Sequence, residues 1–173
     1  MSTVMDFTVG KIALMAIRYW THAALRLIQV AMDIRKITEN YYVAPQMDPS
    51  EMTELAKAGF ATVICNRPDA EVPPSHQADA LEAAAQAAGL DFHRLALTHQ
   101  TMNPPNIARQ RGIVDVSSGK VLAYCASGTR STIAWALGQV GSMSTDDILS
   151  AAQAGGYQLD NIRPTLDAMA SDV

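Results

Sequence analysis

A short apolar run that ends at a cysteine and leads into a helix is the feature that most constrains the fold of this chain. Residues 121–124 are typical of a buried strand, and Cys125 follows them directly. Gly128 then allows a tight turn, because it has no Cβ, and Arg130 and Ser131 belong to the start of a helix. A strand, a tight turn and a helix in this order are typical of an α/β sheet with ligand-binding loops at the carboxyl ends of its strands.

The residues of this turn are suited to binding an anion. Backbone N–H groups of a turn and of a helix N-terminus point toward one spot and favour negative charge there. Such an environment favours the thiolate of a cysteine, and an arginine can hold two oxygens of a phosphate or a sulfur oxyanion. We therefore predict Cys125 as the nucleophile and Arg130 as the anion clamp. The binding loop has six residues: Cys125, Ala126, Ser127, Gly128, Thr129 and Arg130.

Two of these assignments have alternatives. Cys125 can instead be a small buried hydrophobic residue at the end of a strand. Ser131 either donates a hydrogen bond to the Cys125 sulfur and eases its departure, or caps the helix that follows. The combination of strand, cysteine, glycine, arginine and helix favours a site for a small oxyanion or phosphate-ester substrate.

Length, charge and cysteine usage exclude several classes of protein. The 173 residues are enough for one domain with a short appendage, and a net charge of −4 does not suggest a nucleic-acid partner. Two cysteines do not make a disulfide framework, and a catalytic thiol fits a reducing compartment, so we expect a cytoplasmic protein. The four histidines and two cysteines show no metal-ligand spacing, so neither a metal nor another cofactor is expected.

The first 32 residues differ from the rest of the chain, residues 33–173, which we expect to form the catalytic domain. Residues 8–31 contain no acidic residue and predict a basic amphipathic helix. It is not a convincing membrane span, because Arg18 and Arg26 interrupt it and it contains no run of about 18 apolar residues. Three interpretations remain open: contact with a membrane surface or a partner, docking on the chain's own domain, or an extension upstream of a self-sufficient sequence that opens at Met32.

Strands and helices alternate along the catalytic part. Strands are expected at residues 37–43, 61–65, 92–97 and 121–124, with the first at an edge of the sheet. Helices are expected at residues 48–59, 75–88, 103–116, 131–140, 144–154 and 160–170. This order predicts an α/β fold in which helices flank a mostly parallel central sheet. Cys65, the loops 66–71 and 98–103, and Cys125 then share the edge at which such sheets bind ligands.

Residues 32–155 resemble the phosphatase-like domain of beta-lactamase hydrolase-like proteins. The matching segments are MDIR at 32–35, VAPQ at 43–46, CNRPD at 65–69 and YCASGTRS at 124–131. The resemblance implies a cysteine-phosphatase-like fold of the dual-specificity type. It also favours hydrolysis of phosphate esters through a phosphocysteine intermediate on Cys125.

The chain departs from the usual tyrosine-phosphatase pattern in three ways. Four residues, not five, separate Cys125 from Arg130, Tyr124 replaces the usual histidine, and the loop 98–105 has no carboxylate. The short loop resembles that of rhodaneses, in which the cysteine carries a persulfide. We favour the hydrolase, and we keep as alternatives a sulfurtransferase and a module that binds an anion without catalysis.

The resemblance also directs attention to the loop after Cys65. Asp69 is the preferred general acid, although it can equally be a turn residue after a proline, and Glu71 and His99 are other proton donors. Arg67 either adds charge at the mouth of the site or pairs with the carboxylate of Asp69 or Glu71. Some phosphatases of this fold carry a second cysteine at the strand end that Cys65 occupies, which implies a redox-active disulfide with Cys125. An inert core residue is the alternative for Cys65.

Overall fold

The predicted alternation of strands and helices produces a five-stranded sheet between two helical layers. The structure is a computed structural model that describes residues 32–172. The strands are β1 (Arg35–Lys36), β2 (Tyr41–Ala44), β3 (Phe60–Cys65), β4 (Asp91–Arg94) and β5 (Lys120–Tyr124). Their order is β1-β2-β5-β3-β4, and every neighbouring pair is parallel except β1 and β2. The strand β5, which ends directly before Cys125, therefore lies in the middle of the sheet.

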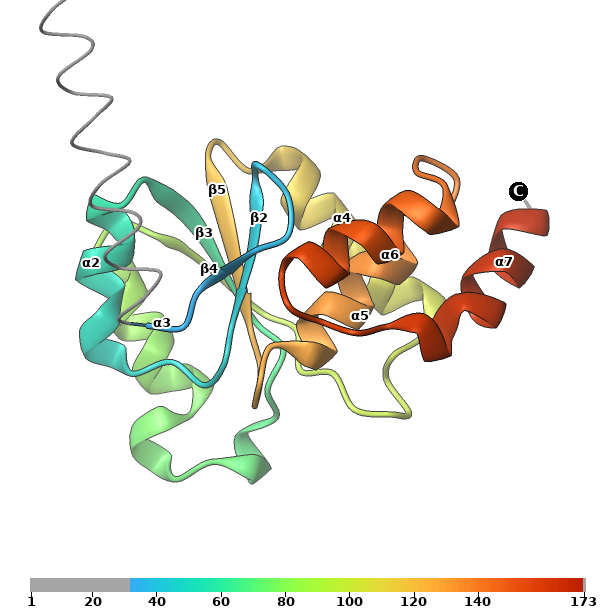
Figure 1. Cartoon of the computed structure of the whole chain (residues 1–173). Helices are drawn as coiled ribbons and strands as arrows, with labels where there is room; N and C mark the ends of the chain where they lie inside the picture. The colour runs from blue at the N-terminus through green and yellow to red at the C-terminus, as the bar shows by residue number, and fades with distance from the viewer. Residues whose placement is uncertain (1–31, 173) are drawn as a thin grey trace, which may run out of the picture.

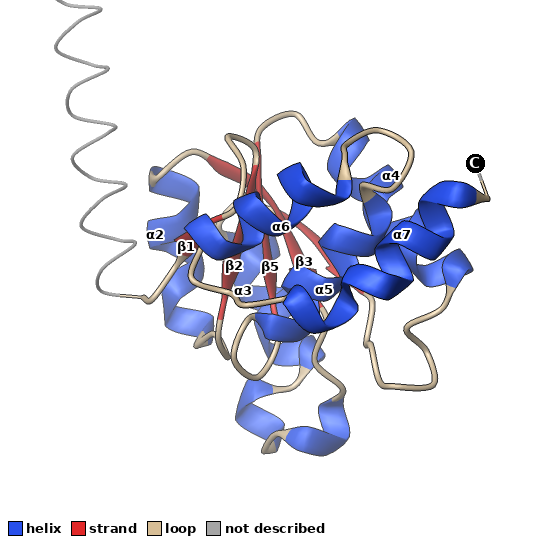
Figure 2. Cartoon of the chain, turned by 45° about the vertical axis from the view of Figure 1, so that its right-hand side comes forward, coloured by secondary structure: helices blue, strands red, loops and turns tan. Residues whose placement is uncertain are grey.

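Helices cover both faces of the sheet (Figure 1). The helices α2 (Met52–Lys57) and α3 (Ala78–Ala87) lie on one face, while α4 (Pro104–Val116), α5 (Thr129–Gly138) and α6 (Thr145–Ala154) lie on the other. The last helix, α7 (Arg163–Ser171), is on the side of α6 (Figure 2). Short 3-10 turns precede or connect these helices: Pro49–Glu51, Asp69–Glu71, Pro74–His76 and Asp160–Ile162.

Side-chain caps explain where several helices begin. The Asp48 carboxylate accepts a hydrogen bond from the backbone N–H of Ser50, and the Glu51 carboxylate accepts one from the backbone N–H of Asp48, so that the two form a capping box. The Asn103 side chain caps α4, and the Ser144 hydroxyl caps α6. Each cap satisfies an N–H group that the helix itself cannot pair.

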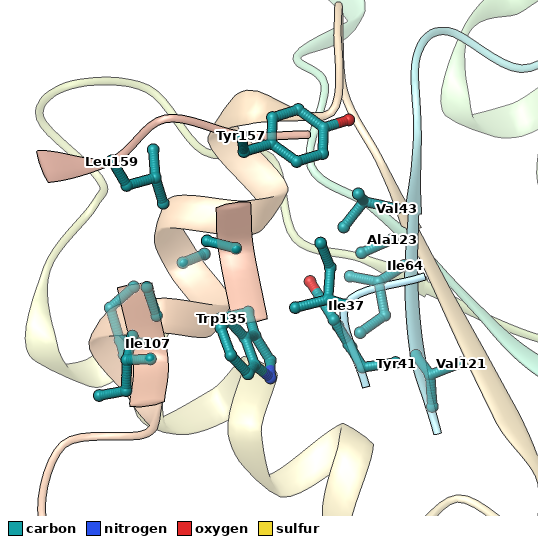
Figure 3. Packing of buried hydrophobic residues seen from close by; sticks show 14 of the residues in the cluster. Ile37, Tyr41, Val43, Ile64, Ile107, Val121, Ala123, Trp135, Tyr157 and Leu159 are labelled. Atoms are coloured by element: carbon teal, nitrogen blue, oxygen red, sulfur yellow. The ribbon is translucent and has the colours of Figure 1, made fainter. Parts of the chain in front are cut away.

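The alternation of side chains along the strands divides the core into two clusters. In β5, Val121 and Ala123 face α4, α5 and α6, whereas Leu122 and Tyr124 face α2 and α3. Figure 3 shows the first cluster, in which Trp135 of α5 lies on the helical side of the strand residues. Because both faces are covered, β2 is buried along its whole length and β5 from Val121 to Tyr124, which is typical of parallel sheets.

The strand predicted at 37–43 is shorter in the structure, and its predicted place at the edge is wrong. Residues 37–40 form the turn between the antiparallel strands β1 and β2, and β2 lies inside the sheet between β1 and β5. The Thr38 hydroxyl accepts a hydrogen bond from the backbone N–H of Tyr41, 3.1 Å away, which closes the turn. All four residues of β2 are buried, so its uninterrupted burial, and not an alternating pattern, marks it as an inner strand.

Other boundaries move by a few residues. The strand expected at 92–97 ends at Arg94 as a regular strand, although the N–H groups of Leu95 and Leu97 still donate to carbonyl groups of Cys65 and Asn66. The predicted basic helix of residues 8–31 lies outside the described residues, so its interpretations stay predictions. Within residues 32–172, no helix has the length and apolar character needed to cross a membrane.

Candidate active site

The six-residue loop leaves the sheet at its centre. The backbone N–H of Cys125 donates to the carbonyl of Ala44 in β2, at 3.4 Å, and the carbonyl of Tyr124 accepts from the N–H of Asn66 after β3, at 2.9 Å. The start of the loop is thus held from both neighbouring strands. Cys125 is only 1% exposed. Its side chain therefore lies at the base of the loop, where water has little access.

Gly128 gives the loop its shape. Its φ is +85°, in the left-handed region, and it is the residue before α5. A Cβ at this position would lie 2.0 Å from the Tyr157 hydroxyl oxygen, which itself donates a hydrogen bond to the carbonyl of Ser127 at 3.1 Å. Thr132 ties the turn to the helix, because its hydroxyl donates to the carbonyl of Gly128 at 2.8 Å. Only glycine satisfies both the backbone angle and the close contact.

The loop offers a series of unpaired donors. Within the described part of the chain, the backbone N–H groups of residues 126–131 donate no hydrogen bond to protein atoms. They belong to the turn and to the first residues of α5, where the partial positive charge of the helix is greatest. A turn of this kind followed by a helix N-terminus is a general binding arrangement for phosphate-like anions.

Arg130 reaches from the loop to the segment after β3. Its Nη1 donates to the carbonyl of Asn66 at 3.3 Å, and its Nη2 donates to the two carboxylate oxygens of Glu71 at 3.0 and 3.3 Å. Arg67 also pairs with Glu71, with 3.4 Å between Nε and Oε2. Of the two partners that the sequence allowed for Arg67, Glu71 is therefore the one observed.

Ser131 has an unusual environment. Its side chain is fully buried, and its hydroxyl has no hydrogen-bond partner among the described residues. A buried hydroxyl without a partner is unfavourable, so the position is suited to a group that arrives or ionises during a reaction. The proposed hydrogen bond from this hydroxyl to the Cys125 sulfur is absent in this structure and stays a prediction.

A buried polar network lies behind the loop, and the sequence analysis missed it. The Tyr41 hydroxyl donates to the carbonyl of Ser131 at 3.0 Å and accepts from the Gln110 amide at 2.9 Å. The Gln110 carbonyl oxygen in turn accepts from the Asn66 amide at 2.9 Å. These hydrogen bonds join β2, α4, the end of β3 and the start of α5. The polar Gln110 on a helix face that is otherwise apolar was the one available signal.

Two tyrosines near Cys125 have raised pKa values. Burial raises the pKa of Tyr41 well above its usual value, and the negative charge of a Cys125 thiolate raises it further. Burial also raises the pKa of Tyr157 to about 12, with a smaller contribution from Cys125. Both phenols therefore remain protonated at neutral pH and can act as hydrogen-bond donors around the loop.

The predicted proton donors have different roles in the structure. Asp69 accepts a hydrogen bond from the backbone N–H of Ala78 at 2.7 Å, so its carboxylate holds the start of α3. His99 is exposed on the loop after β4. Glu71 is the carboxylate that contacts Arg130. In the structure Asp69 therefore contacts the start of α3, and its role as general acid stays a prediction.

Cys65 ends β3, and Cys125 follows the end of the neighbouring strand β5. Cys65 pairs in register with Tyr124, the residue before Cys125, and Cys65 and Tyr124 both pack in the cluster that includes α2 and α3. The Cys65 thiol donates to the carbonyl of Arg67 at 3.3 Å, and burial raises its pKa. The Tyr124 hydroxyl lies beside this thiol but makes no hydrogen bond of good geometry among the described residues. Both cysteines are free, and the predicted disulfide stays a prediction.

No cluster of three or more histidine, cysteine, aspartate or glutamate side chains capable of holding a metal ion occurs among residues 32–172.

The fold and the site define a class. A mostly parallel central sheet with helices on both faces is the fold of cysteine phosphatase-like proteins. The family described as "Beta-lactamase hydrolase-like protein, phosphatase-like domain" matches residues 33–142. The chain belongs to this family, as the resemblance of its motifs predicted.

Individual relatives agree with this assignment. The beta-lactamase hydrolase-like protein of Xylella fastidiosa (strain Temecula1) is 31% identical over 130 residues, which are 74% of this chain and 30% of that protein. The chain thus corresponds to less than a third of the length of this relative. A protein of Neisseria meningitidis Z2491, described as a candidate phosphatase, has a structure with a TM-score of 0.71 and 31% identity, covering 80% of this chain and 99% of its own.

A more distant structure shares the fold alone. TpbA of Pseudomonas aeruginosa, solved with phosphotyrosine, has a TM-score of 0.54 and 12% identity, covering 83% of this chain and 93% of its own. The cysteine-phosphatase-like fold that was predicted from the sequence is confirmed.

Proposed function

We propose that this domain hydrolyses phosphate esters through a phosphocysteine intermediate on Cys125. The observation that carries the proposal is the combination of a buried cysteine with a loop of unpaired donors. The backbone N–H groups of residues 126–131, which follow Cys125, have no hydrogen-bond partner within the described part of the chain, and Arg130 lies on the same loop. Three phosphoryl oxygens require many donors around one point, and a loop of this kind supplies them.

The reaction follows from the positions of these groups. The phosphoryl oxygens accept hydrogen bonds from the loop N–H groups and from Arg130, while the Cys125 thiolate attacks phosphorus. The P–O bond to the leaving group breaks. The oxygen of the leaving group either takes a proton or, where the leaving group is a stable anion such as a nitrophenolate, departs without one. Water then attacks the phosphocysteine and releases inorganic phosphate and the thiolate. The unpaired Ser131 hydroxyl is suited to donate a hydrogen bond to the sulfur as it leaves.

The comparisons support a phosphate-ester substrate in general terms. TpbA has been solved with phosphotyrosine, and it shares the fold with this chain. We infer that a small phosphate ester, such as an aryl phosphate, is the substrate class to test first. The curated relatives are more than three times as long as the matched region, so the activity of a longer protein is a separate question.

The loop length favours one second candidate. A six-residue loop from Cys125 to Arg130 is also suited to sulfur transfer from thiosulfate. In that reaction the thiolate attacks the outer sulfur, the S–S bond breaks, sulfite leaves as an anion, and Cys125 becomes a persulfide. Cyanide then takes this sulfur as thiocyanate and restores the thiolate. Sulfite leaves without protonation, so this reaction needs no general acid.

One experiment separates the candidates. The protein is assayed with an aryl phosphate, and separately with thiosulfate plus cyanide, beside Cys125→Ser and Arg130→Lys. We expect release of phosphate that both variants lose, because serine is not ionised and lysine lacks the planar fork of arginine. Thiocyanate formation without phosphate release would select the sulfurtransferase. Inactivity of the wild-type protein with both substrates would favour a module that only binds an anion.

A further inference from the structure

Glu71 is the side chain that contacts the anion clamp most directly. It lies at the end of the 3-10 turn Asp69–Glu71, and 59 positions separate it from Arg130 in the sequence. The Arg130 guanidinium donates to both of its carboxylate oxygens, at 3.0 and 3.3 Å. We propose that Glu71 is a positioning residue, which holds the Arg130 guanidinium in the orientation that receives the phosphoryl group. The catalytic part of this proposal rests on the proposed function.

The number of donors on arginine shows why this contact is compatible with substrate binding. A guanidinium has five N–H groups arranged as a rigid planar fork. In Arg130, Nη1 donates to the carbonyl of Asn66 and Nη2 donates to both carboxylate oxygens of Glu71, while Nε–H and the second hydrogen of Nη1 have no partner among the described residues. These two N–H groups are still available to the oxygens of an anion. Glu71 thus holds one terminal nitrogen of the fork and leaves other donors open.

Arg67 holds Glu71 in turn. Its Nη2 donates to the backbone carbonyl of Glu71 at 3.1 Å, and its Nε lies 3.4 Å from the Glu71 carboxylate. The Arg67 and Arg130 side chains are only 19% and 26% exposed, and Glu71 is 35% exposed. Partial burial and several contacts restrict these side chains more than an isolated surface ion pair would. The three residues form a chain from the loop after β3 to the anion loop.

The consequence for the reaction is specific. An arginine that must be oriented anew in each turnover contributes less to the transition state, because its orientation then has an entropic cost. Glu71 also carries a negative charge, which repels an incoming anion. We therefore expect loss of Glu71 to lower kcat without raising KM. A residue that competes with the substrate for Arg130 would have the opposite effect, since its removal would raise kcat/KM.

The first test uses kinetics with an aryl phosphate. Glu71→Ala is expected to lower kcat about tenfold, and Glu71→Gln by less, because its amide oxygen can still accept from Arg130. KM should not rise, and the melting temperature should change little. The matched control is Glu54→Ala, which removes an exposed ion pair with Lys57 on α2 and should leave kcat unchanged. A Glu71→Ala enzyme with unchanged or increased kcat/KM would overturn the proposal, and Glu71→Gln carries the test if the alanine variant does not fold.

The second test does not depend on catalysis. Tungstate, an unreactive oxyanion, is titrated by calorimetry into the wild-type protein, Arg130→Ala, Glu71→Ala and the double variant. If Glu71 orients Arg130, the loss of affinity caused by Arg130→Ala should be at least about threefold smaller when Glu71 is already absent. Equal losses in both backgrounds would mean that the residues act independently, and the positioning role would be rejected. Since this result needs no turnover, it separates failure of this inference from failure of the proposed function.

Discussion

Replacing Gly128 by alanine tests the geometry of the anion loop most severely. Two separate penalties act at this position. The left-handed φ of +85° costs an L-residue about 1–2 kcal/mol, and the lower entropy of the unfolded alanine chain returns about 0.4–1 kcal/mol. The new Cβ would also lie 2.0 Å from the Tyr157 hydroxyl, so the ring must move and its hydrogen bond to Ser127 is lost. Forced repacking and the lost hydrogen bond add about 2–4 kcal/mol.

Gly89 provides a matched control for the first penalty. Its φ is +79°, and a Cβ there would have no atom within 4 Å. We expect Gly89→Ala to lower the free energy of unfolding by about 1 kcal/mol and Gly128→Ala by about 3–4 kcal/mol. The measurement is urea denaturation of both variants, followed by tungstate titration. Only Gly128→Ala should also weaken oxyanion binding, because only this residue belongs to the loop.

A third variant isolates the contact with Tyr157. Tyr157→Phe in the Gly128→Ala background removes the closest atom, although the ring carbon Cζ, 2.9 Å from the new Cβ, remains. Part of the lost stability should therefore return. If Gly128→Ala is no more destabilising than Gly89→Ala, the packing of Tyr157 on the loop is not as described, and the reasoning is refuted.

Three further predictions concern the proton donor, the second cysteine and the N-terminal segment. If Asp69 is the general acid, Asp69→Asn should slow hydrolysis of alkyl phosphates about 10²–10⁴-fold and of nitrophenyl phosphate far less; equal effects would assign it only the cap of α3. Mild peroxide should inactivate the enzyme reversibly through a disulfide between Cys65 and Cys125, which mass spectrometry of the oxidised protein would detect. Inactivation that is unchanged in Cys65→Ser would reject this. A chain beginning at Met32 should fold and retain its turnover, as circular dichroism and the phosphate assay can verify, and aggregation would show that the preceding residues are needed.

Local signals predicted most of the fold. The capped start at Asp48, the proline-rich start of α4 at Asn103 and the glycine at the turn into α5 each depend on neighbours a few residues away. The same is true of the buried strand before Cys125. The hairpin of β1 and β2 was missed because the Thr38 side chain closes a turn within a run that looked like one strand.

Long-range contacts within the site could not be predicted in this way. The sequence separates Glu71 from Arg130 by 59 positions, Tyr41 from Gln110 by 69, and Ser127 from Tyr157 by 30. None of these pairs has a spacing rule, because each depends on the order of the strands. The cysteine and the arginine could be predicted from the sequence, because their proposed roles depend on their own chemistry. The residues that hold them could not.

Trapping the covalent intermediate tests the central claim most directly. The protein is mixed with an aryl phosphate, quenched in acid within the first turnovers, digested, and examined by mass spectrometry. A nucleophilic Cys125 predicts a phosphoryl group on the peptide that contains it, with none on the same peptide of Cys125→Ser. An active enzyme that yields no phosphocysteine, or a Cys125→Ser variant that still releases phosphate at the wild-type rate, would contradict the account.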